Sequence, residues 1–351
     1  MKLLICTQAV DKNHPILGFF HRWIEEFARH CEVVHVICLY EGAHSLPENV
    51  QVHSLGKESG ESKFKYLLRF YRYTWQLRGE YDAVFVHMNQ IYVILGALLW
   101  RLQKKQIGLW YAHGKVSNSL KVAEKLTHLI FTSTEEGLQL STPKRRIVGQ
   151  GIDLDHFAYK ERIHDANLLR LVTVGRISRS KNLETLIDAC ASLKEQGTRF
   201  TFRIVGVAIT EEEKQYEKEM REKVKKLNLD EQVEWVGAVS QKDLPEELYK
   251  ADAFIHDGAT QSLDKALLEA VACGCVVVSS NLAYKTLTEA IAPQYIFKNN
   301  DSGALASIVY RVVSLDFSQK YESMHVVRAE IARLHSIDGL IGTIISHLKK
   351  I

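Results

Sequence analysis

The chain has 351 residues, of which 46% are hydrophobic and 25% are charged. That balance excludes an intrinsically disordered chain, and the 20 glycines and 5 prolines exclude collagen-like and low-complexity classes. The formal net charge of +3 is small, but residues 51–150 carry 15 Lys and Arg against 7 Asp and Glu. At roughly 100–200 residues per domain, the length predicts two domains.

The first half of the chain alternates short apolar runs with helical patterns. This alternation is typical of a parallel sheet that helices cover on both faces. Strands are predicted at Leu3–Thr7, Val33–Leu39, Val50–His53, Ala83–His87, Ile107–Tyr111, Leu129–Thr132 and Ile147–Val148. Helices are predicted at Phe19–Arg29, Phe64–Arg78, Ile91–Gln103 and Ser119–Leu126, and a long loop at Gln8–Leu17.

The same alternation restarts after residue 165. The turn-rich segment Gly149–Asp153 predicts a linker, and residues 317–351 read as two or three helices. The chain is therefore predicted to be α/β, with two Rossmann-like doubly wound domains and a ligand in the cleft at their strand ends. Strands are predicted at Arg170–Val174, Thr201–Val205, Val233–Val236, Ala253–His256, Val276–Ser279 and Tyr295–Phe297. Helices are predicted at Leu183–Gln196, Glu212–Leu227, Leu244–Lys250, Lys265–Ala272 and Ala304–Leu315.

Cysteine usage and hydropathy bear on the compartment. The six cysteines lack the paired spacing of zinc sites and lie in apolar runs, as buried free thiols do. No run reaches the roughly 18 apolar residues of a membrane span, and the sequence shows no secretory signal. We expect a reducing compartment, the cytoplasm.

Glycine-rich phosphate loops are missing from the strand ends. The first loop leads to a single Gly18, and Gly206 follows a strand without glycine companions. The absence of G-x-G-x-x-G and of a Walker loop disfavours hydride transfer and P-loop phosphoryl transfer.

A cationic loop follows the first strand of the second half. The strand ends at Gly175 and a helix begins at Asn182 or Leu183, so Arg176 and Lys181 are predicted at the carboxyl edge of the sheet. Two cations beside a helix N-terminus suit a diphosphate. The structural alternative is a solvated basic loop.

A second polar loop lies within Asp257–Gly274. A helix is predicted to begin around Asp264, with Gln261 and Glu269 flanking its first turns. Backbone N–H groups at its start can accept a phosphate, and Glu269 can bond the vicinal hydroxyls of a ribose. The alternative is an i,i+4 pair between Lys265 and Glu269 on an exposed face.

Together these loops resemble the nucleotide-sugar-dependent glycosyltransferases of the GT-B fold, in particular the retaining family 4 type (glycosyl transferases group 1). That family carries a G-R-x-x-x-x-K loop and later two glutamates separated by seven residues, the second in L-E-A-x-A-x-G. The matching segments here are Gly175–Lys181 and Leu268–Gly274, and Gly151–Phe157 matches the family's linker, with Gln150 in place of Asn. Shorter matches in the expected order are Ile5–Thr7, Trp110–Gly114, Val236–Gly237 and Ala251–Ala253.

The resemblance implies a division of labour between the two domains. Residues 1–150 plus 330–351 would form the acceptor-binding domain, with the C-terminal helix returning to it, and residues 151–329 the donor-binding domain. The two would face a central cleft.

The resemblance also implies roles for individual residues. Arg176 and Lys181 would bind the donor pyrophosphate and Glu269 the ribose. His113 would contact the donor sugar near its C6 hydroxyl, unless it is a buried structural histidine. Gly18 would let the first loop approach the donor, and backbone groups near Val239 would meet the base. The full set of implied donor-binding positions is Gly18, Gly206, Val239, Ser262, Leu263, Asp264 and Lys265.

One position departs from the family pattern. The first glutamate of the family pair falls on Gln261, and the usual Glu-x-Phe-Gly is replaced by Gln261–Asp264, followed by Lys265. Two explanations stay open: altered recognition of the donor sugar, with Asp264 or Lys265 taking part, or loss of catalysis. We favour the first.

The implied reaction is front-side transfer from a UDP- or GDP-sugar to a glycan or lipid-linked acceptor in envelope polysaccharide or glycolipid synthesis. It needs no protein nucleophile, no metal and no cofactor beyond the sugar nucleotide. The D-x-D at Asp153–Asp155 falls in the linker pattern, so we do not interpret it as a metal site. Besides the enzyme, a catalytically impaired sugar-nucleotide-binding protein and a GT-B epimerase or phosphorylase remain alternatives.

A basic aromatic stretch, residues 63–78, lies in the first domain, with Arg101, Lys104 and Lys105 further along. Such a composition favours an anionic membrane surface, which would place the protein peripherally at the inner membrane face. The alternative is that its apolar side packs on the sheet while Lys and Arg extend into water. No nucleic-acid recognition module accompanies it, so we expect no nucleic-acid partner.

Overall fold

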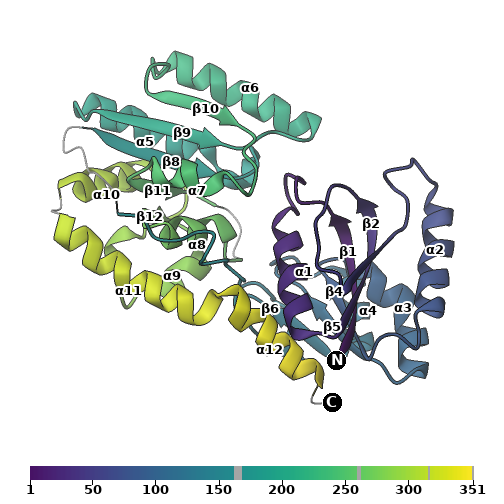
Figure 1. The fold of residues 1–351 in the computed structure, drawn as a ribbon. Helices are drawn as coiled ribbons and strands as arrows, with labels where there is room; N and C mark the ends of the chain where they lie inside the picture. Colours follow the sequence, from purple (N-terminus) through teal and green to yellow (C-terminus); the bar gives the residue numbers. More distant parts are fainter. Residues whose placement is uncertain (162–167, 259–261, 315–316, 350–351) are drawn as a thin grey trace. The chain divides into compact units, whose positions relative to one another are not determined.

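The computed structural model describes residues 1–161, 168–258, 262–314 and 317–349 (Figure 1). The chain divides into two compact units, unit 1 (Met1–Asp153 with Leu334–Ile351) and unit 2 (Leu154–Arg333). These bounds lie within a few residues of the expected 150 and 330. The last helix, labelled α12 in Figure 1, belongs to unit 1.

Unit 1 is built on a seven-stranded parallel sheet with the strand order β3-β2-β1-β4-β5-β6-β7. Successive side chains alternate between its faces, so Leu3 and Ile5 enter one core cluster and Leu4 and Cys6 the other. Both faces are covered, which explains the continuous apolar runs of the sequence. The strands are β1 (Lys2–Val10), β2 (Val33–Glu41), β3 (Val50–Ser54), β4 (Ala83–His87), β5 (Gln106–Trp110), β6 (Leu129–Thr132) and β7 (Arg145–Ile147).

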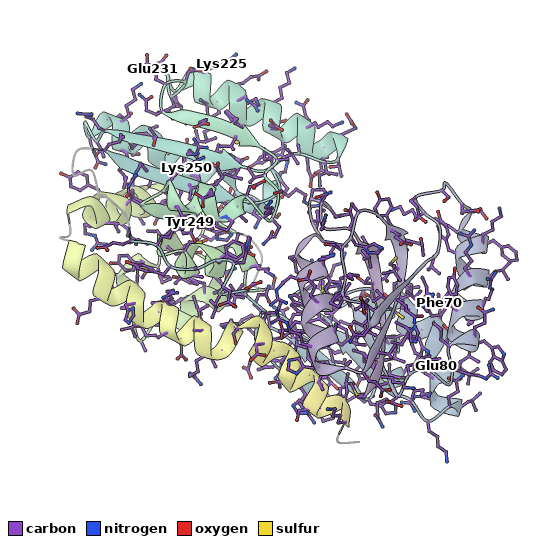
Figure 2. The ribbon with its side chains drawn as sticks, in the orientation of Figure 1. Phe70, Glu80, Lys225, Glu231, Tyr249 and Lys250 are labelled. Atoms are coloured by element: carbon purple, nitrogen blue, oxygen red, sulfur yellow. The ribbon has the colours of Figure 1, made fainter. Side chains whose placement is uncertain are left out.

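Helices cover both faces of this sheet. On one face lie α2 (Lys63–Gln76), α3 (Ile91–Leu102) and α4 (Asn118–Leu126), and on the other α1 (Phe19–His30) and α12 (Ile337–Lys349). Phe70 points from α2 toward the sheet in Figure 2 and is 1% exposed. The N–H of Ile152 donates to the carbonyl of His335 and that of Ile337 to the carbonyl of Ile152, at 2.7 and 2.9 Å. These two bonds fasten the start of α12 to the end of the linker.

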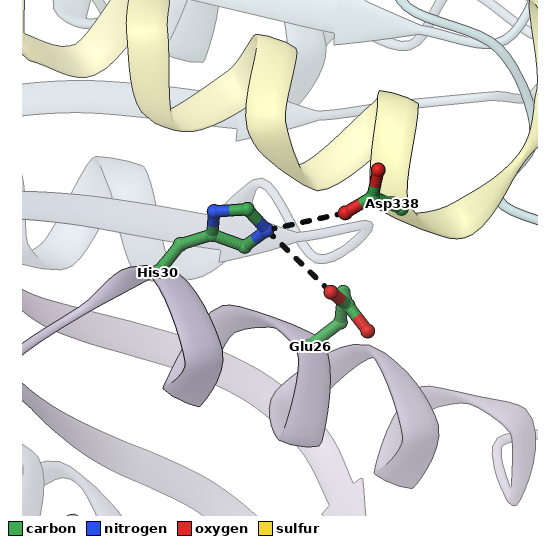
Figure 3. Close-up of side chains that lie close together, drawn as sticks. All are labelled: Glu26, His30 and Asp338. Atoms are coloured by element: carbon green, nitrogen blue, oxygen red, sulfur yellow. Dashed lines mark ion pairs between the residues drawn. The ribbon is translucent and has the colours of Figure 1, made fainter.

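An ionic cluster joins α1 to α12 on that second face (Figure 3). The Nε2 atom of His30 lies 3.5 Å from a carboxylate oxygen of Glu26 and 3.6 Å from one of Asp338. The other oxygen of Glu26 pairs with Arg22 and Arg29 at 2.9 and 3.1 Å. Because Glu26 is buried, these cations satisfy a charge that would otherwise be costly.

Unit 2 is built on a five-stranded parallel sheet with the order β10-β9-β8-β11-β12. The helix α5 packs against α6 and α10, while α8 contacts β11 and β12. The strands are β8 (Leu169–Val174), β9 (Phe200–Val205), β10 (Val233–Gly237), β11 (Ala253–His256) and β12 (Val276–Ser279). The helices are η1 (Arg179–Lys181), α5 (Leu183–Glu195), α6 (Glu211–Lys226), α7 (Leu244–Tyr249), α8 (Lys265–Ala272), α9 (Leu282–Thr288), η2 (Pro293–Tyr295), α10 (Ser302–Ser314) and α11 (Phe317–His335).

Two local predictions are wrong, and one α-helix was not predicted. β1 continues to Val10, so the loop predicted from Gln8 starts only at Asp11. The strand predicted at Tyr295–Phe297 is replaced by η2 and one isolated bridge from Ile296 to Ser279, because Pro293 starts a helical turn. The helix α9 was missed, although Asn281 caps it by accepting a bond from the N–H of Tyr284.

Other expectations are confirmed. Two or three helices were predicted for residues 317–351, and the structure has two there, α11 and α12. All six cysteines are buried free thiols. The basic strand β7 lies at the edge of its sheet, where charged residues protect against pairing with another chain.

Candidate functional site

The candidate site lies at the carboxyl edge of the unit 2 sheet. All strands of this sheet run parallel, so the loops that follow them meet at one edge. Four of these loops contain predicted site residues: the loops after β8, β9, β10 and β11.

Two glycines bring the loops after β8 and β9 into direct backbone contact. Gly175 has φ +149° and Gly206 has φ +142°. A Cβ atom on Gly206 would lie 1.9 Å from the carbonyl oxygen of Gly175, and one on Gly175 would lie 2.9 Å from Cε of Lys181. Gly206 is therefore required by the packing of its own unit, whatever its role toward a ligand.

Lys181 and Asp264 form an ion pair at the centre of this edge. The ammonium of Lys181 donates to Oδ2 of Asp264, and Nε2 of His256 lies 3.3 Å from the same oxygen. Asp264 also caps α8, because Oδ1 accepts a bond from the N–H of Ala266 at 3.2 Å. Burial alone would raise the pKa of Asp264, but Lys181 and His256 lower that pKa more, and it lies well below its usual range.

Arg176 is half-exposed on the same loop as Lys181. Its Nε lies 3.1 Å from Oε1 of Glu213. The other oxygen of Glu213, Oε2, accepts bonds from the N–H groups of Ile209 and Thr210. Glu213 completes a capping box at the start of α6. The position of Arg176 is thus set from α6. The alternative of a merely solvated basic loop is wrong for Lys181, which is held by Asp264.

Glu269 lies inside α8 and is buried. Its carboxylate accepts a bond from the side-chain amide of Gln241 at 3.1 Å, and the carbonyl of Gln241 contacts Nε2 of His156 at 2.8 Å. The exposed helix face that the alternative required is therefore wrong for Glu269, although Lys265 is close enough to act on its carboxyl. Burial raises the pKa of Glu269 to about 7, since the nearby Lys265 and the bond from Gln241 offset only part of the desolvation.

This raised pKa predicts a pH dependence of stability. In the unfolded chain the carboxyl loses its proton near the ordinary value of 4.5, whereas in the folded chain it does so near 7. The stability that the protonated form provides is complete below pH 4.5 and is lost as the pH rises through 7. The loss is about 3 kcal/mol for the full shift.

Unfolding of the Glu269→Gln variant by denaturant should therefore depend less on pH between 5 and 8 than unfolding of the wild type. The control is Glu211→Gln, since Glu211 has an exposed side chain in α6. Parallel stability profiles for wild type and Glu269→Gln would contradict the assignment.

Asp257 organises the floor of the site and was missed from the sequence. It is fully buried and accepts bonds from the side chains of Asn182, Ser280 and Asn299 and from the N–H of Asn300. It thereby ties the start of α5 to the loop after β12. The available signal was a titratable residue at the end of a buried parallel strand: His256 is the last residue of β11, and Asp257 directly follows it. Gln241 gave none.

The remaining predicted donor residues of unit 2 surround this edge. Leu263 is buried, and the carbonyl of Ser262 accepts a bond from Asn281 at 3.0 Å. Val239 and Lys265 are half-buried. Gln261 lies outside the described residues, so its role stays a prediction.

Two predicted residues lie in unit 1. Gly18 starts α1 in an ordinary helical conformation, and its Cβ would lie 2.8 Å from the carbonyl oxygen of His14, so that its small size serves the packing of the loop. His113 is exposed, and its Nδ1 accepts a bond from the N–H of Lys115 at 3.0 Å. The alternative of a buried histidine is therefore wrong, and sugar contact stays a prediction for His113.

Figure 3 shows the candidate for a metal site, which consists of Glu26, His30 and Asp338. Among the described residues, it is the one group of potential metal ligands whose atoms lie close enough together to hold an ion. Arg22 and Arg29 already neutralise Glu26, so we assign no metal to it. In the D-x-D segment, Asp153 accepts a bond from Nε of Arg22 at 2.7 Å.

Comparison with known proteins points to sugar transfer. Residues 159–325, all within unit 2, match the family model described as glycosyl transferases group 1. WcaL of Escherichia coli K12, described as a colanic acid biosynthesis glycosyltransferase, is 29% identical over 187 residues, which are 51% of this chain and 45% of WcaL. The amylovoran biosynthesis glycosyltransferase AmsK of Erwinia amylovora is 30% identical over 176 residues, 48% of this chain and 42% of AmsK. The chain thus matches less than half the length of these relatives.

A solved structure covers the whole chain. The crystal structure of Anabaena HepE in complex with UDP and glucose superposes with a TM-score of 0.78 at 18% identity, covering 100% of both chains. The chain therefore has the GT-B fold of glycosyltransferases, with two Rossmann-like α/β units.

Proposed function

We propose that the protein is a retaining glycosyltransferase of the family 4 type, which moves a sugar from a UDP- or GDP-sugar to a glycan or lipid-linked acceptor in envelope polysaccharide or glycolipid synthesis. One observation carries this proposal. Within the segment that matches the family, Lys181, Asp264 and His256 converge at the carboxyl edge of the unit 2 sheet, with Arg176 on the same loop as Lys181.

The donor half of the reaction follows from the charges at this edge. Lys181 and Arg176 bind the diphosphate and stabilise its negative charge as the bond between the anomeric carbon and the phosphate oxygen breaks. Glu269 binds the ribose hydroxyls, and its place beside Gln241 links the ribose to the loop of Val239, which meets the base.

The acceptor half needs no protein nucleophile. The acceptor hydroxyl attacks the anomeric carbon on the face that the diphosphate leaves, and its proton passes to the departing diphosphate. Unit 1 binds the acceptor, and His113 contacts the donor sugar. Neither a metal nor a further cofactor takes part, and we place the reaction in the cytoplasm at the inner membrane face.

Arg176→Ala is expected to raise the dissociation constant of the donor nucleotide about tenfold, since hydrogen bonds between charged groups are the strong ones. Calorimetric titration measures this constant. Arg221→Ala is a matched control, because Arg221 is 47% exposed against 46% for Arg176 and also pairs with a glutamate of unit 2. Unchanged binding in Arg176→Ala would refute the pyrophosphate assignment.

A donor screen separates transfer from mere binding. A ligand that binds only the folded protein raises its melting temperature, so UDP- and GDP-sugars are first ranked by thermal shift. The purified protein with the best donor should then release nucleotide slowly by hydrolysis. Binding without release, for every donor tried, would favour the sugar-nucleotide-binding protein that Gln261 motivates, whereas turnover without any acceptor to another sugar nucleotide would favour an epimerase.

A further inference from the structure

The outer faces of α2 and α3 in unit 1 expose an unusual number of large apolar side chains. We call these seven residues the α2–α3 surface. Individual exposed apolar residues are normal, but a contiguous set marks an interaction site. The members are Phe64, Leu68, Tyr71 and Trp75 of α2 and Ile91, Leu98 and Leu102 of α3.

The α2 contribution is one stripe along the helix. Phe64, Leu68, Tyr71 and Trp75 follow each other at steps of four, three and four residues, which places them on one side. Phe70 and Thr74 are buried on another side. The sequence left open that the apolar side chains of α2 pack on the sheet. That holds for the buried residues of α2 but not for the exposed stripe.

The α3 contribution points directly away from the sheet. Val93, Ala97 and Trp100 are fully buried, while Leu98 and Leu102 on the opposite side are 72% and 73% exposed. Residues 91–100 contain no charged side chain. A helix that is apolar on all sides is normally covered on all sides, so the outer face of α3 calls for a partner. The hydroxyl of Tyr71 donates to the carbonyl of Leu95 at 3.2 Å, which joins the two helices into one surface.

The two helical segments carry charges of one sign, and Glu61, just before α2, pairs with Lys65 and Arg69. Residues 63–78 contain five Lys and Arg and residues 91–105 contain three, and neither segment contains Asp or Glu. Two of these cations point inward, since Lys105 donates to the carbonyl of Tyr81 and Arg69 to that of Leu55. The other six are exposed: Lys63, Lys65, Arg72, Arg78, Arg101 and Lys104.

We propose that the α2–α3 surface docks unit 1 on an anionic phospholipid bilayer, with both helices lying along the membrane. Aromatic and aliphatic side chains with cations beside them suit the boundary between headgroups and acyl chains. Arg78, for example, lies 4.6 Å over the Trp75 ring. Within the described ranges, no helix is both long and apolar enough to cross a bilayer.

A second copy of the chain fits this surface less well. A two-fold contact would bring the same surface of two molecules together, and its cations would then repel one another. A bilayer that contains anionic lipid offers charge complementarity and apolar depth at once. The proposal does not depend on sugar transfer, because membrane binding requires neither donor nor acceptor.

The test is cosedimentation of the full chain with vesicles at low salt, using phosphatidylcholine alone and phosphatidylcholine mixed with phosphatidylglycerol. We expect binding to the mixed vesicles and its loss at high salt. The double variant Leu98→Ser with Leu102→Ser should bind at least tenfold more weakly, and Arg72→Gln and Arg78→Gln should each cost about fivefold. The replaced side chains are exposed, and circular dichroism verifies folding.

The matched control is Ile209→Ser with Val326→Ser, which removes two exposed aliphatic side chains from unit 2 and should bind like the wild type. Equal sedimentation with neutral and anionic vesicles, or none with either, would overturn the proposal. Self-association that disappears in the leucine double variant, without vesicle binding, would assign the surface to a second copy of the chain instead.

Discussion

Lys181→Ala and Asp264→Asn are expected to change the affinity for a nucleoside diphosphate in opposite directions. Lys181→Ala should weaken binding at least about tenfold, because it removes a charged group that we propose as a partner of the diphosphate. Asp264→Asn should tighten binding by about threefold or more, since the ligand then no longer competes with a carboxylate for the Lys181 ammonium. The Asn side chain can still cap α8.

Calorimetric titration with the preferred nucleotide measures both constants. Lys223→Ala is the matched control, because Lys223 forms another Lys–Asp pair of unit 2, at 2.7 Å from Asp188, and its exposure of 27% is close to the 24% of Lys181. A loss of affinity in Asp264→Asn as large as in Lys181→Ala would show that the pair is needed intact. The ligand would then not displace the carboxylate.

Gly206→Ala is expected to destabilise unit 2 by about 3 kcal/mol or more. The new Cβ would lie 1.9 Å from the carbonyl oxygen of Gly175, and the φ of +142° is costly for any residue with a side chain. Since these two backbones carry the loops of the site, nucleotide binding should weaken at temperatures where the unit is still folded. Denaturant unfolding measures the free energy of unfolding.

The control for this variant separates strain from collision. Gly197 also has a positive φ, +73°, but a Cβ on it would meet nothing within 4 Å. Gly197→Ala should therefore cost only the conformational penalty, about 1–2 kcal/mol. Equal destabilisation by the two substitutions would mean that the loops after β8 and β9 do not touch as described.

The sequence predicted the architecture well because both sheets are parallel and buried. Buried strands leave unmistakable apolar runs, and helices between them can only return the chain to the same edge. It failed at two places: the helical turn that begins at Pro293 stands where a strand was predicted at Tyr295–Phe297, and β1 continues three residues past Thr7. Where a strand or helix ends depends on its contacts with neighbouring segments, and the hydrophobic periodicity of the sequence does not encode those contacts.

The site was predictable in its loops and unpredictable in its contacts. Arg176, Lys181 and Glu269 stood out because charged residues follow buried strands or enter an apolar helix. The partners could not be foreseen, since Lys181 meets Asp264 across 83 residues and Gln241 meets Glu269 across 28. Asp264 was predicted as a donor-binding residue, whereas its role in holding Lys181 emerges only from the folded chain.

The central claim is that the carboxyl edge of the unit 2 sheet binds the diphosphate of a sugar donor. The most direct measurement is calorimetric titration of the full chain with UDP and with GDP, for the wild type and for the double variant Arg176→Ala with Lys181→Ala. We predict saturable binding of one of these nucleotides at one site per chain, abolished in the double variant. Binding of neither nucleotide, or equal binding to both proteins, would contradict the claim.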